Sequence, residues 1–223
     1  FPDRPLTPLE ERQRLLSHHV RLVTRGMTNG LFVHGETGGL GKSRVIQATL
    51  DNEYADFVLV NSHITAMSLY ETLFVHRRGT IIWLDDCDGR YRDLKVLGLL
   101  RSALWGQGER VVTYTSSQLP DALPPSFVFK SRIIMTANTL PQKNSAFRAV
   151  LSRIDIFSLE ASSDEVVDLM KAVARQGFED LDDEDCLMVV DFIAQNAAGR
   201  QLSMRLLQTS FRKLKYARSK GLE

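Results

Sequence analysis

The chain has 223 residues, of which 43% are hydrophobic and 25% are charged, and its formal net charge at pH 7 is +1. This balance is typical of a folded globular protein and excludes a chain that is disordered overall. Because the net charge is close to zero, it gives no reason to expect an anionic partner, so any nucleic-acid contact must be argued from local features.

The ends and the cysteines of the chain indicate a cytoplasmic protein. No apolar run approaches the roughly 18–20 residues that span a bilayer, and the start, Phe1-Pro2-Asp3-Arg4, lacks the pattern of a signal peptide. Since the first residue is not Met, we expect the numbering to begin inside a longer protein. Cys87 and Cys186 lack the CxxC spacing of a zinc or redox site, which favours a reduced, cytoplasmic location without a membrane partner.

The first part of the chain alternates helix and strand patterns. Apolar residues recur at helical spacing from 7 to 25, and Asn29-Gly30 then marks a turn before the apolar run 31–33. Further strands are predicted at 57–60, 81–84 and 133–136, the first of them buried, and helices at 43–50, 67–75 and 94–105. This alternation indicates an α/β layered domain with a mainly parallel sheet.

The last part of the chain reads as helical. Strand patterns end near Leu159, and three helices are predicted at 163–175, 183–196 and 200–219. The first two open with Ser162-Ser163-Asp164-Glu165 and Asp182-Asp183-Glu184-Asp185, which suit helix N-termini. We therefore predict an α/β domain over 1–159 and a small helical domain over 160–223.

A glycine-rich segment lies between the first strand and the helix that follows it. Val33-His34-Gly35-Glu36-Thr37-Gly38-Gly39-Leu40-Gly41-Lys42-Ser43 has the context of a phosphate-binding P-loop. Its backbone N–H groups can surround phosphate oxygens, Lys42 can reach the β- and γ-phosphates, and the Ser43 hydroxyl can hold Mg²⁺. The alternative is a glycine-rich turn that binds nothing.

The loop departs from the usual GxxxxGK[ST] spacing. Five residues separate Gly35 from Gly41, and the usual spacing would place the first glycine at Glu36. We expect a loop that is one residue longer, with Gly38 and Gly39 absorbing the difference. The residues expected to bind ATP are Gly35, Thr37, Gly38, Gly39, Leu40, Gly41, Lys42, Ser43 and Arg44.

A second acidic motif ends an apolar strand, Ile81-Ile82-Trp83-Leu84-Asp85-Asp86. Ligands of open α/β sheets bind at the carboxyl ends of the strands, so we expect Asp85 to coordinate Mg²⁺ and Asp86 to orient or deprotonate the attacking water. A solvated turn is the plainer interpretation. A calcium loop is excluded by register, because placing Gly89 sixth puts Leu84 where an acid is required.

Taken in order, these motifs resemble those of the AAA+ ATPases over nearly the whole chain. That resemblance implies a three-layer P-loop NTPase core with a helical lid, and ATP hydrolysis between the subunits of a homo-oligomeric ring or filament. It implies Asn138 as the polar sensor at the end of its strand and Arg153, in Ser152-Arg153, as a finger that reaches a neighbour's ATP. Arg148 is the rival finger.

Two further expectations come from the same resemblance. In the lid, Arg205 is the expected sensor arginine, with Arg200 as the alternate. The family usually has glutamate where this chain has Asp86, which leaves open slow hydrolysis or a binding-controlled switch. The alternatives to an ATP-hydrolysing motor are an ATP-dependent interaction scaffold with little hydrolysis and a P-loop small-molecule kinase, which would have a substrate pocket in place of the Arg153 finger.

A DNA-related role is the first expectation for what the ATPase acts on. The runs 111–115 and 127–130, joined by a proline-rich turn, predict a hairpin at the place where some AAA+ members insert one that touches DNA or protein. An ordinary edge hairpin fits equally. The last helix carries cations that could neutralise phosphates or form a solvated face: Arg212, Lys213, Lys215, Arg218 and Lys220.

Overall fold

The computed structural model describes residues 4–61, 64–86, 93–116, 119–141, 144–197 and 201–221. The chain divides into two compact units. The sheet unit comprises Leu16–Glu36 and Lys42–Ser158. The helical unit comprises Phe1–Leu15, Thr37–Gly41 and Leu159–Glu223, so five residues of the glycine-rich loop group with the helices.

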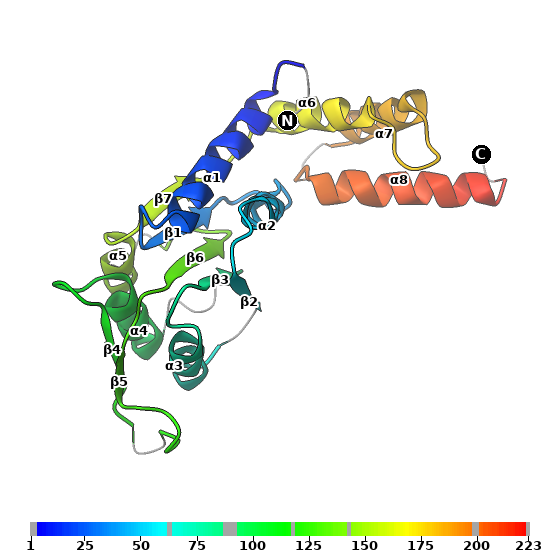
Figure 1. The fold of residues 1–223 in the computed structure, drawn as a ribbon. Coiled ribbons are helices and arrows are strands. Elements are labelled where there is room, and N and C mark those ends of the chain that lie inside the picture. The colour runs from blue at the N-terminus through cyan, green and yellow to red at the C-terminus, as the bar shows by residue number, and fades with distance from the viewer. Residues whose placement is uncertain are drawn as a thin grey trace. The chain divides into compact units, whose positions relative to one another are not determined.

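The sheet unit contains a five-stranded parallel sheet among its described residues, in the order β2-β3-β6-β1-β7 (Figure 1). Its strands are β1 (Gly30–His34), β2 (Phe57–Asn61), β3 (Ile81–Asp85), β6 (Arg132–Ala137) and β7 (Asp155–Ser158). In the register, Phe32 of β1 is opposite Met135 of β6 and Ile156 of β7. The predicted α/β fold with a mainly parallel sheet is confirmed.

One face of the sheet carries the main hydrophobic core. Helices α3 (Ala66–Val75), α4 (Leu94–Leu104) and α5 (Ser145–Leu151) pack there. Because side chains alternate along a strand, Phe32, Ile82 and Met135 point to this face while their neighbours point to the other. The buried residues of α4, such as Leu97, recur at helical spacing. This pattern is the reason that the sequence predicted a helix here.

The opposite face is covered by α2 (Lys42–Asn52) and by the part of α1 (Pro8–Thr24) that belongs to the sheet unit (Figure 1). Leu16 and Val20 of α1 are fully buried, as is Ile46 of α2. The two helices also share a buried hydrogen bond of 3.1 Å from the Thr49 hydroxyl to the Ser17 hydroxyl. The sheet is therefore covered on both faces, as an all-parallel sheet requires.

An antiparallel pair, β4 (Val111–Thr113) and β5 (Ser126–Val128), forms a small second sheet in the same unit. Val112 lies opposite Phe127, and both side chains are buried against the core. The hairpin predicted from the runs 111–115 and 127–130 is confirmed.

Two edge strands differ from the sequence-based expectations. The strand at 57–60 was expected to be buried, but β2 lies at one edge of the sheet, and Leu59 is 40% exposed there. At the other edge, β7 and the preceding helix α5 had not been predicted as elements. An edge strand lacks one neighbour, so an apolar run does not by itself show burial.

The helical unit contains α6 (Ser163–Ala174), α7 (Asp183–Gln195) and α8 (Met204–Ser219). Ser162 caps α6 in a capping box with Glu165, and Asp182 caps α7 by accepting from the backbone N–H of Asp185 at 2.9 Å. The division of the chain at 159/160 stays a prediction.

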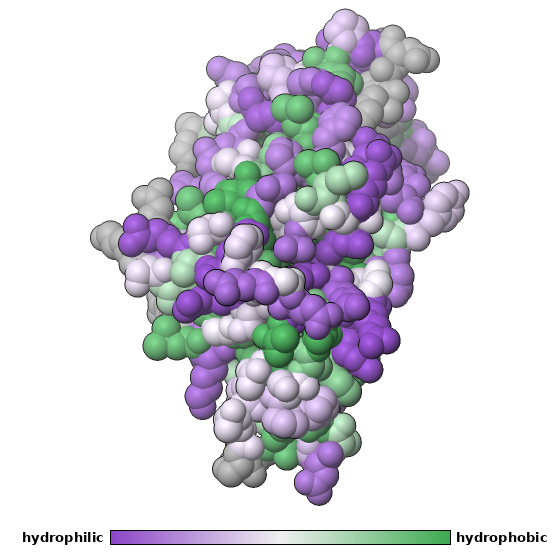
Figure 2. All heavy atoms as spheres, turned by 60° about the vertical axis from the view of Figure 1, so that its left-hand side comes forward, coloured by the Kyte–Doolittle hydropathy of each residue, from purple (hydrophilic) through white to green (hydrophobic). Residues whose placement is uncertain are grey.

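The face of the molecule drawn in Figure 2 is mixed in character. Hydrophobic residues form separate patches among hydrophilic ones there, without one continuous apolar surface. Within the described residues, no helix combines the length and the apolar character that crossing a membrane requires.

Candidate nucleotide-binding site

Lys42, the lysine predicted to bind phosphate, is the first residue of α2 and directly follows the glycine-rich loop. Its Nζ donates to the carbonyl oxygen of Gly35 at 2.7 Å and lies 3.5 Å from Oδ1 of Asn138. Gly35 directly follows β1, and Asn138 directly follows β6, the strand beside β1. The structure thus brings the predicted lysine and the predicted sensor together at the carboxyl ends of the central strands.

The predicted magnesium ligands are hydrogen-bonded to each other. The Ser43 hydroxyl donates to the two carboxylate oxygens of Asp85 at 3.1 and 3.3 Å. Asp85 is half-buried at the end of β3 and also accepts a hydrogen bond from the Thr136 hydroxyl on β6. A hydroxyl beside a carboxylate supplies the hard oxygen atoms that Mg²⁺ prefers, so these residues fit that ion.

Asp86 adopts an unusual backbone conformation. Its φ angle is +52°, in the left-handed region that aspartate tolerates better than most residues. Its backbone N–H donates to the Thr136 hydroxyl at 3.0 Å, and its carboxylate accepts from the Asn138 amide at 3.3 Å. The exposed Asp86 and Asn138 side chains therefore lie together at the strand ends.

Thr136 is a candidate site residue that was not predicted from the sequence. Its side chain is 2% exposed, and its hydroxyl donates to Asp85 while accepting from the Asp86 backbone. The hydroxyl therefore fixes the two acids relative to β6. Its position two residues before Asn138 could have indicated this role, because residues two apart in a strand lie on the same side of the sheet.

The apex of the loop contacts the start of α8 within the helical unit. The backbone N–H of Met204 donates to the carbonyl oxygen of Gly39 at 3.2 Å. A Cβ atom at Gly39 would lie 2.8 Å from Cβ of Ser203 and 3.5 Å from Cγ of Arg205. Gly39 also has a φ angle of +76°, so this one position has both the left-handed backbone and the close approach that favour glycine.

The neighbouring loop residue is fixed by α1. Leu40 is fully buried, and its carbonyl oxygen accepts from the side-chain amide of Gln13 at 2.8 Å. Gly38, in contrast, has no left-handed φ, and a Cβ atom added there would meet no described atom within 4 Å. An added side chain would therefore meet the start of α8 at Gly39 and open space at Gly38.

The arginine candidates differ in exposure. Arg153 follows α5 and is half-buried, and its guanidinium donates to the carbonyl oxygen of Ala149 on that helix. Arg148 is exposed on α5, and Arg205 is exposed in the first turn of α8. The alternate Arg200 lies outside the described residues, and Arg44 is exposed on α2.

The basic residues of α8 are partly neutralised. Lys215 forms ion pairs with Glu179 at 2.6 Å and Asp180 at 2.8 Å, and Arg218 pairs with Asp185. Hydrogen bonds from Asp180 and then Glu179 raise the pKa of Lys215. Two of the five predicted phosphate-binding cations of this helix are therefore already paired within the helical unit.

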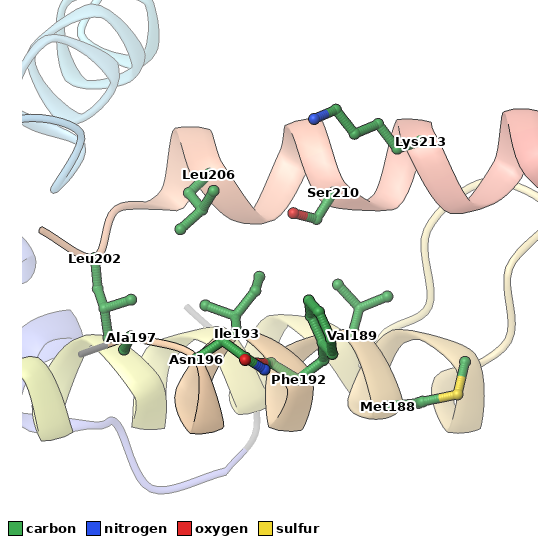
Figure 3. A pocket seen from close by; sticks show the side chains of 10 residues that line it. All are labelled: Met188, Val189, Phe192, Ile193, Asn196, Ala197, Leu202, Leu206, Ser210 and Lys213. Carbon is green, nitrogen blue, oxygen red and sulfur yellow. The ribbon is translucent and has the colours of Figure 1, made fainter. Parts of the chain in front are cut away.

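The helical unit also has an apolar hollow between α7 and α8 (Figure 3). The cavity measures about 470 Å³, and Ile193 and Phe192 of α7 face Leu206 and Ser210 of α8 across it. Among its lining residues in the described part of the chain, Lys213 is the one that is charged. These described residues include no carboxylate and no glycine of the kind that suits a magnesium–phosphate ligand.

Comparisons with known proteins agree with this geometry at the level of the fold. No protein-family model matches the chain. One curated relative, an uncharacterised 36.7 kDa protein of Enterobacteria phage T4, is 28% identical over 129 residues, which is 52% of this chain. The chain spans 39% of the length of that phage protein.

Solved structures are similar over nearly the whole chain. The RuvB Holliday junction branch migration motor of Thermotoga maritima matches with a TM-score of 0.51 and 15% identity, covering 93% of this chain and 70% of that one. A variant of the same motor matches with a TM-score of 0.53 and 14% identity, covering 94% and 71%. The chain therefore shares the fold of this motor, with a parallel α/β core and C-terminal helices.

Proposed function

We propose that this chain is an ATPase that binds and hydrolyses Mg-ATP at the edge of the sheet where Lys42, Ser43, Asp85 and Asp86 lie. The observation that carries the proposal is the hydrogen-bonded set of Ser43, Asp85 and Thr136, which joins α2, β3 and β6. A hydroxyl, a carboxylate and a lysine at one edge of a parallel sheet form the group that triphosphate binding needs.

Lys42 and the glycine-rich loop hold the phosphates in this proposal. The backbone N–H groups of Gly35 to Arg44 and the N-terminus of α2 favour anionic oxygens. The Lys42 ammonium exchanges its hydrogen bond with the Gly35 carbonyl for phosphate oxygens. Lysine is suited to this exchange because its flexible stem lets a compact charge move between partners.

Ser43 and Asp85 hold the magnesium ion, directly or through water. When bound, Mg²⁺ neutralises charge that develops on the phosphates during transfer. Thr136 keeps Asp85 oriented, because its buried hydroxyl donates a hydrogen bond to that carboxylate.

Asp86 and Asn138 act on the attacking water. The Asp86 carboxylate orients or deprotonates the water for in-line attack on the γ-phosphate, and the Asn138 amide keeps that carboxylate in place. Aspartate is shorter than the family's usual glutamate. The left-handed backbone of Asp86 also sets the direction of the carboxylate, so slow turnover in a binding-controlled switch is the second candidate function.

An arginine from a neighbouring subunit completes the site in a homo-oligomeric ring or filament. Arg153 is the proposed finger and Arg148 the alternate, while Arg205 is the proposed lid sensor. Support for Arg153 is its guanidinium, which stays charged and can engage phosphate oxygens bidentately. Its hydrogen bond with Ala149 would have to open first, whereas Arg148 is already exposed.

The energy of hydrolysis serves a macromolecular process that involves DNA. Support comes from the β4–β5 hairpin and from the likeness in fold to a protein described as a Holliday junction motor. The substrate class is therefore nucleic acid, with ATP as the reactant.

Steady-state phosphate release tests hydrolysis. Wild type should release phosphate from Mg-ATP, while Asp86→Asn, which keeps size and removes the carboxylate charge, should release it at least about tenfold more slowly. If the two proteins release phosphate equally slowly while both bind ATP, the chain is a binding-controlled switch, and the proposal that it is an ATP-hydrolysing enzyme is wrong.

Mixed oligomers test the shared site. Arg153→Ala and Lys42→Ala are each expected to be inactive alone, and a mixture should regain activity where an intact Lys42 site meets an intact Arg153. The same experiment is done with Arg148→Ala in place of Arg153→Ala. If mixing Arg148→Ala with Lys42→Ala restores activity and mixing Arg153→Ala with Lys42→Ala does not, Arg148 is the finger and Arg153 is not. A monomeric kinase can show no such rescue.

A further inference from the structure

Five cations lie on the side of the sheet where the strands begin, opposite the strand ends that carry Asp85 and Asn138. They belong to the α3–β3 turn, to the segments flanking the hairpin and to the start of β6: Arg77, Arg78, Arg110, Lys130 and Arg132. We call them the basic edge. The backbone N–H of Lys130 donates to the carbonyl oxygen of Arg77 at 2.8 Å, and that of Phe129 donates to the carbonyl oxygen of Arg110 at 2.7 Å, which brings these segments side by side.

The side chains of Arg110 and Arg132 are close enough to repel each other. Burial, together with the nearby charge of Arg132, lowers the pKa of the Arg110 guanidinium. Arg110 donates to the carbonyl oxygen of Ala103 at 2.9 Å and lies 5.3 Å from the centre of the Phe129 ring. Arg132 donates to the carbonyl oxygen of Thr24 at 3.2 Å. These contacts are to neutral groups, so they leave the two charges uncompensated.

No carboxylate forms an ion pair with the basic edge in the parts of the chain that the structure describes. The nearby acids are otherwise placed: Glu53 pairs with Arg21 and Arg25, and Asp56 accepts from the Thr80 hydroxyl. Glu109 is exposed beside Arg110 without pairing to it. The local charge is therefore positive although the whole chain is nearly neutral.

An exposed tryptophan lies beside these cations. Trp105 directly follows α4 and is 57% exposed. The two residues before it hold it at this edge, because the Ala103 carbonyl accepts from Arg110 and the Leu104 carbonyl accepts from Asn29 at 3.2 Å. A large aromatic ring beside unpaired cations offers stacking to a base and charge to the adjoining phosphates.

We propose that the basic edge and Trp105 bind single-stranded nucleic acid, with the cations on phosphates and the indole stacked on a base. The partner is assigned by chemistry: unpaired guanidinium and ammonium groups suit phosphates, and the exposed indole suits a base that no complementary strand covers. This surface is separate from the residues proposed to bind ATP, so its binding is independent of hydrolysis.

Anisotropy of a fluorescein-labelled oligothymidylate tests the charges. Arg78→Glu/Lys130→Glu reverses two exposed side chains that make no side-chain hydrogen bond to a described residue, so the fold should be retained. We expect the affinity to fall about tenfold or more, and the salt dependence to weaken by roughly 0.7 per lost phosphate contact.

The matched control is Arg212→Glu/Lys213→Glu on α8. It makes the same change in net charge at two exposed positions. The cations of α8 are the rival surface for phosphate contacts, but the proposal places the strand on the basic edge, so we expect less than about a threefold loss of affinity, from weaker long-range attraction. Equal losses in the two double variants, or a larger loss in the α8 variant, would overturn the proposal.

Substitutions of Trp105 test stacking. Trp105→Ala should weaken binding of the single strand about tenfold, and Trp105→Phe should restore most of it because a ring face remains. A duplex of the same length should bind more weakly than the single strand and should not respond to Trp105→Ala. If Trp105→Ala binds the single strand as wild type does, or if the duplex binds more tightly, the proposal is wrong.

Discussion

The substitution Gly39→Ala addresses the part of the glycine-rich loop where the sequence departs from the usual spacing. The φ angle of Gly39 is +76°, and a Cβ atom there would lie 2.8 Å from Cβ and 3.3 Å from Oγ of Ser203. Alanine therefore meets two obstacles, the left-handed backbone and a contact that is too short for two carbon atoms. Either the loop or the start of α8 must move.

The left-handed backbone and the short contact with Ser203 both set the expected loss of ATP affinity. The left-handed conformation costs an L-residue about 1–2 kcal/mol. If the loop relaxes in the free protein and must return to this conformation to hold phosphates, the same energy appears as a loss of about 5–30-fold in ATP affinity. The contact with Ser203 adds to that loss, because the hydrogen bond from Met204 to the Gly39 carbonyl keeps the two segments together.

Two further variants separate the cost of the left-handed backbone from the cost of the contact with Ser203. Gly38→Ala changes the adjacent residue, which has no left-handed φ and no described atom within 4 Å of the added carbon, so its affinity should stay within about twofold of wild type. Ser203→Gly in the Gly39→Ala background removes the short contact and leaves the backbone cost. Ser203 is the N-cap of α8, and replacing serine by glycine at an N-cap costs only a few tenths of a kcal/mol, so we expect partial recovery.

The assay is titration with a fluorescent ATP analogue in the presence of Mg²⁺, with circular dichroism of each free variant as the control for folding. Gly39→Ala should bind most weakly, the Gly39→Ala/Ser203→Gly variant should be intermediate, and Gly38→Ala should match wild type. If Gly39→Ala binds as tightly as Gly38→Ala, the left-handed conformation at Gly39 is not the one that holds the phosphates.

Three further outcomes are expected. Thr136→Val, which keeps shape and removes the hydroxyl, should slow phosphate release about tenfold or more, because the Asp86 backbone N–H and the Asp85 carboxylate lose their shared partner, while Thr136→Ser should stay near wild type. Ser162→Ala should lower stability by about 1 kcal/mol through loss of the capping box, seen as a melting point about 2–4 °C lower, and Ser163→Ala should not. Cys186 is 0% exposed, and burial raises the pKa of its thiol, so in a Cys87→Ser background it should react with Ellman's reagent only after unfolding; rapid reaction of the folded protein would contradict this burial.

The central layers of the fold could be predicted from the sequence because their patterns are strong. Three central strands contain the apolar runs 31–33, 81–84 and 133–135, which is the composition of buried parallel strands. Asp85 is the last residue of β3, and Gly35 and Asn138 come directly after β1 and β6. The edges could not be predicted equally well. The apolar run of β2 carries no sign that a neighbour is missing on one side, and β7 is only four residues long.

The candidate site divides in the same way. Lys42, Ser43 and Asp85 could be predicted as site residues from residue type and spacing, since Lys42 and Ser43 begin α2 and Asp85 ends β3. Thr136 could not be assigned a role, because its contact with Asp85 depends on the register between β3 and β6. The contact of Gly39 with Ser203 joins residues 164 positions apart, and no local pattern indicates it.

Calorimetric titration of Mg-ATP into the wild-type chain and into Lys42→Ala tests the central claim most directly. The variant removes the ammonium group that lies between the Gly35 carbonyl and Asn138, and it leaves the Ser43–Asp85 pair in place. We predict saturable binding by wild type that requires Mg²⁺ for full affinity, and at least about a tenfold loss in Lys42→Ala. Absence of ATP binding by folded wild type, or equal binding by Lys42→Ala, would contradict the claim that this edge of the sheet is a nucleotide site.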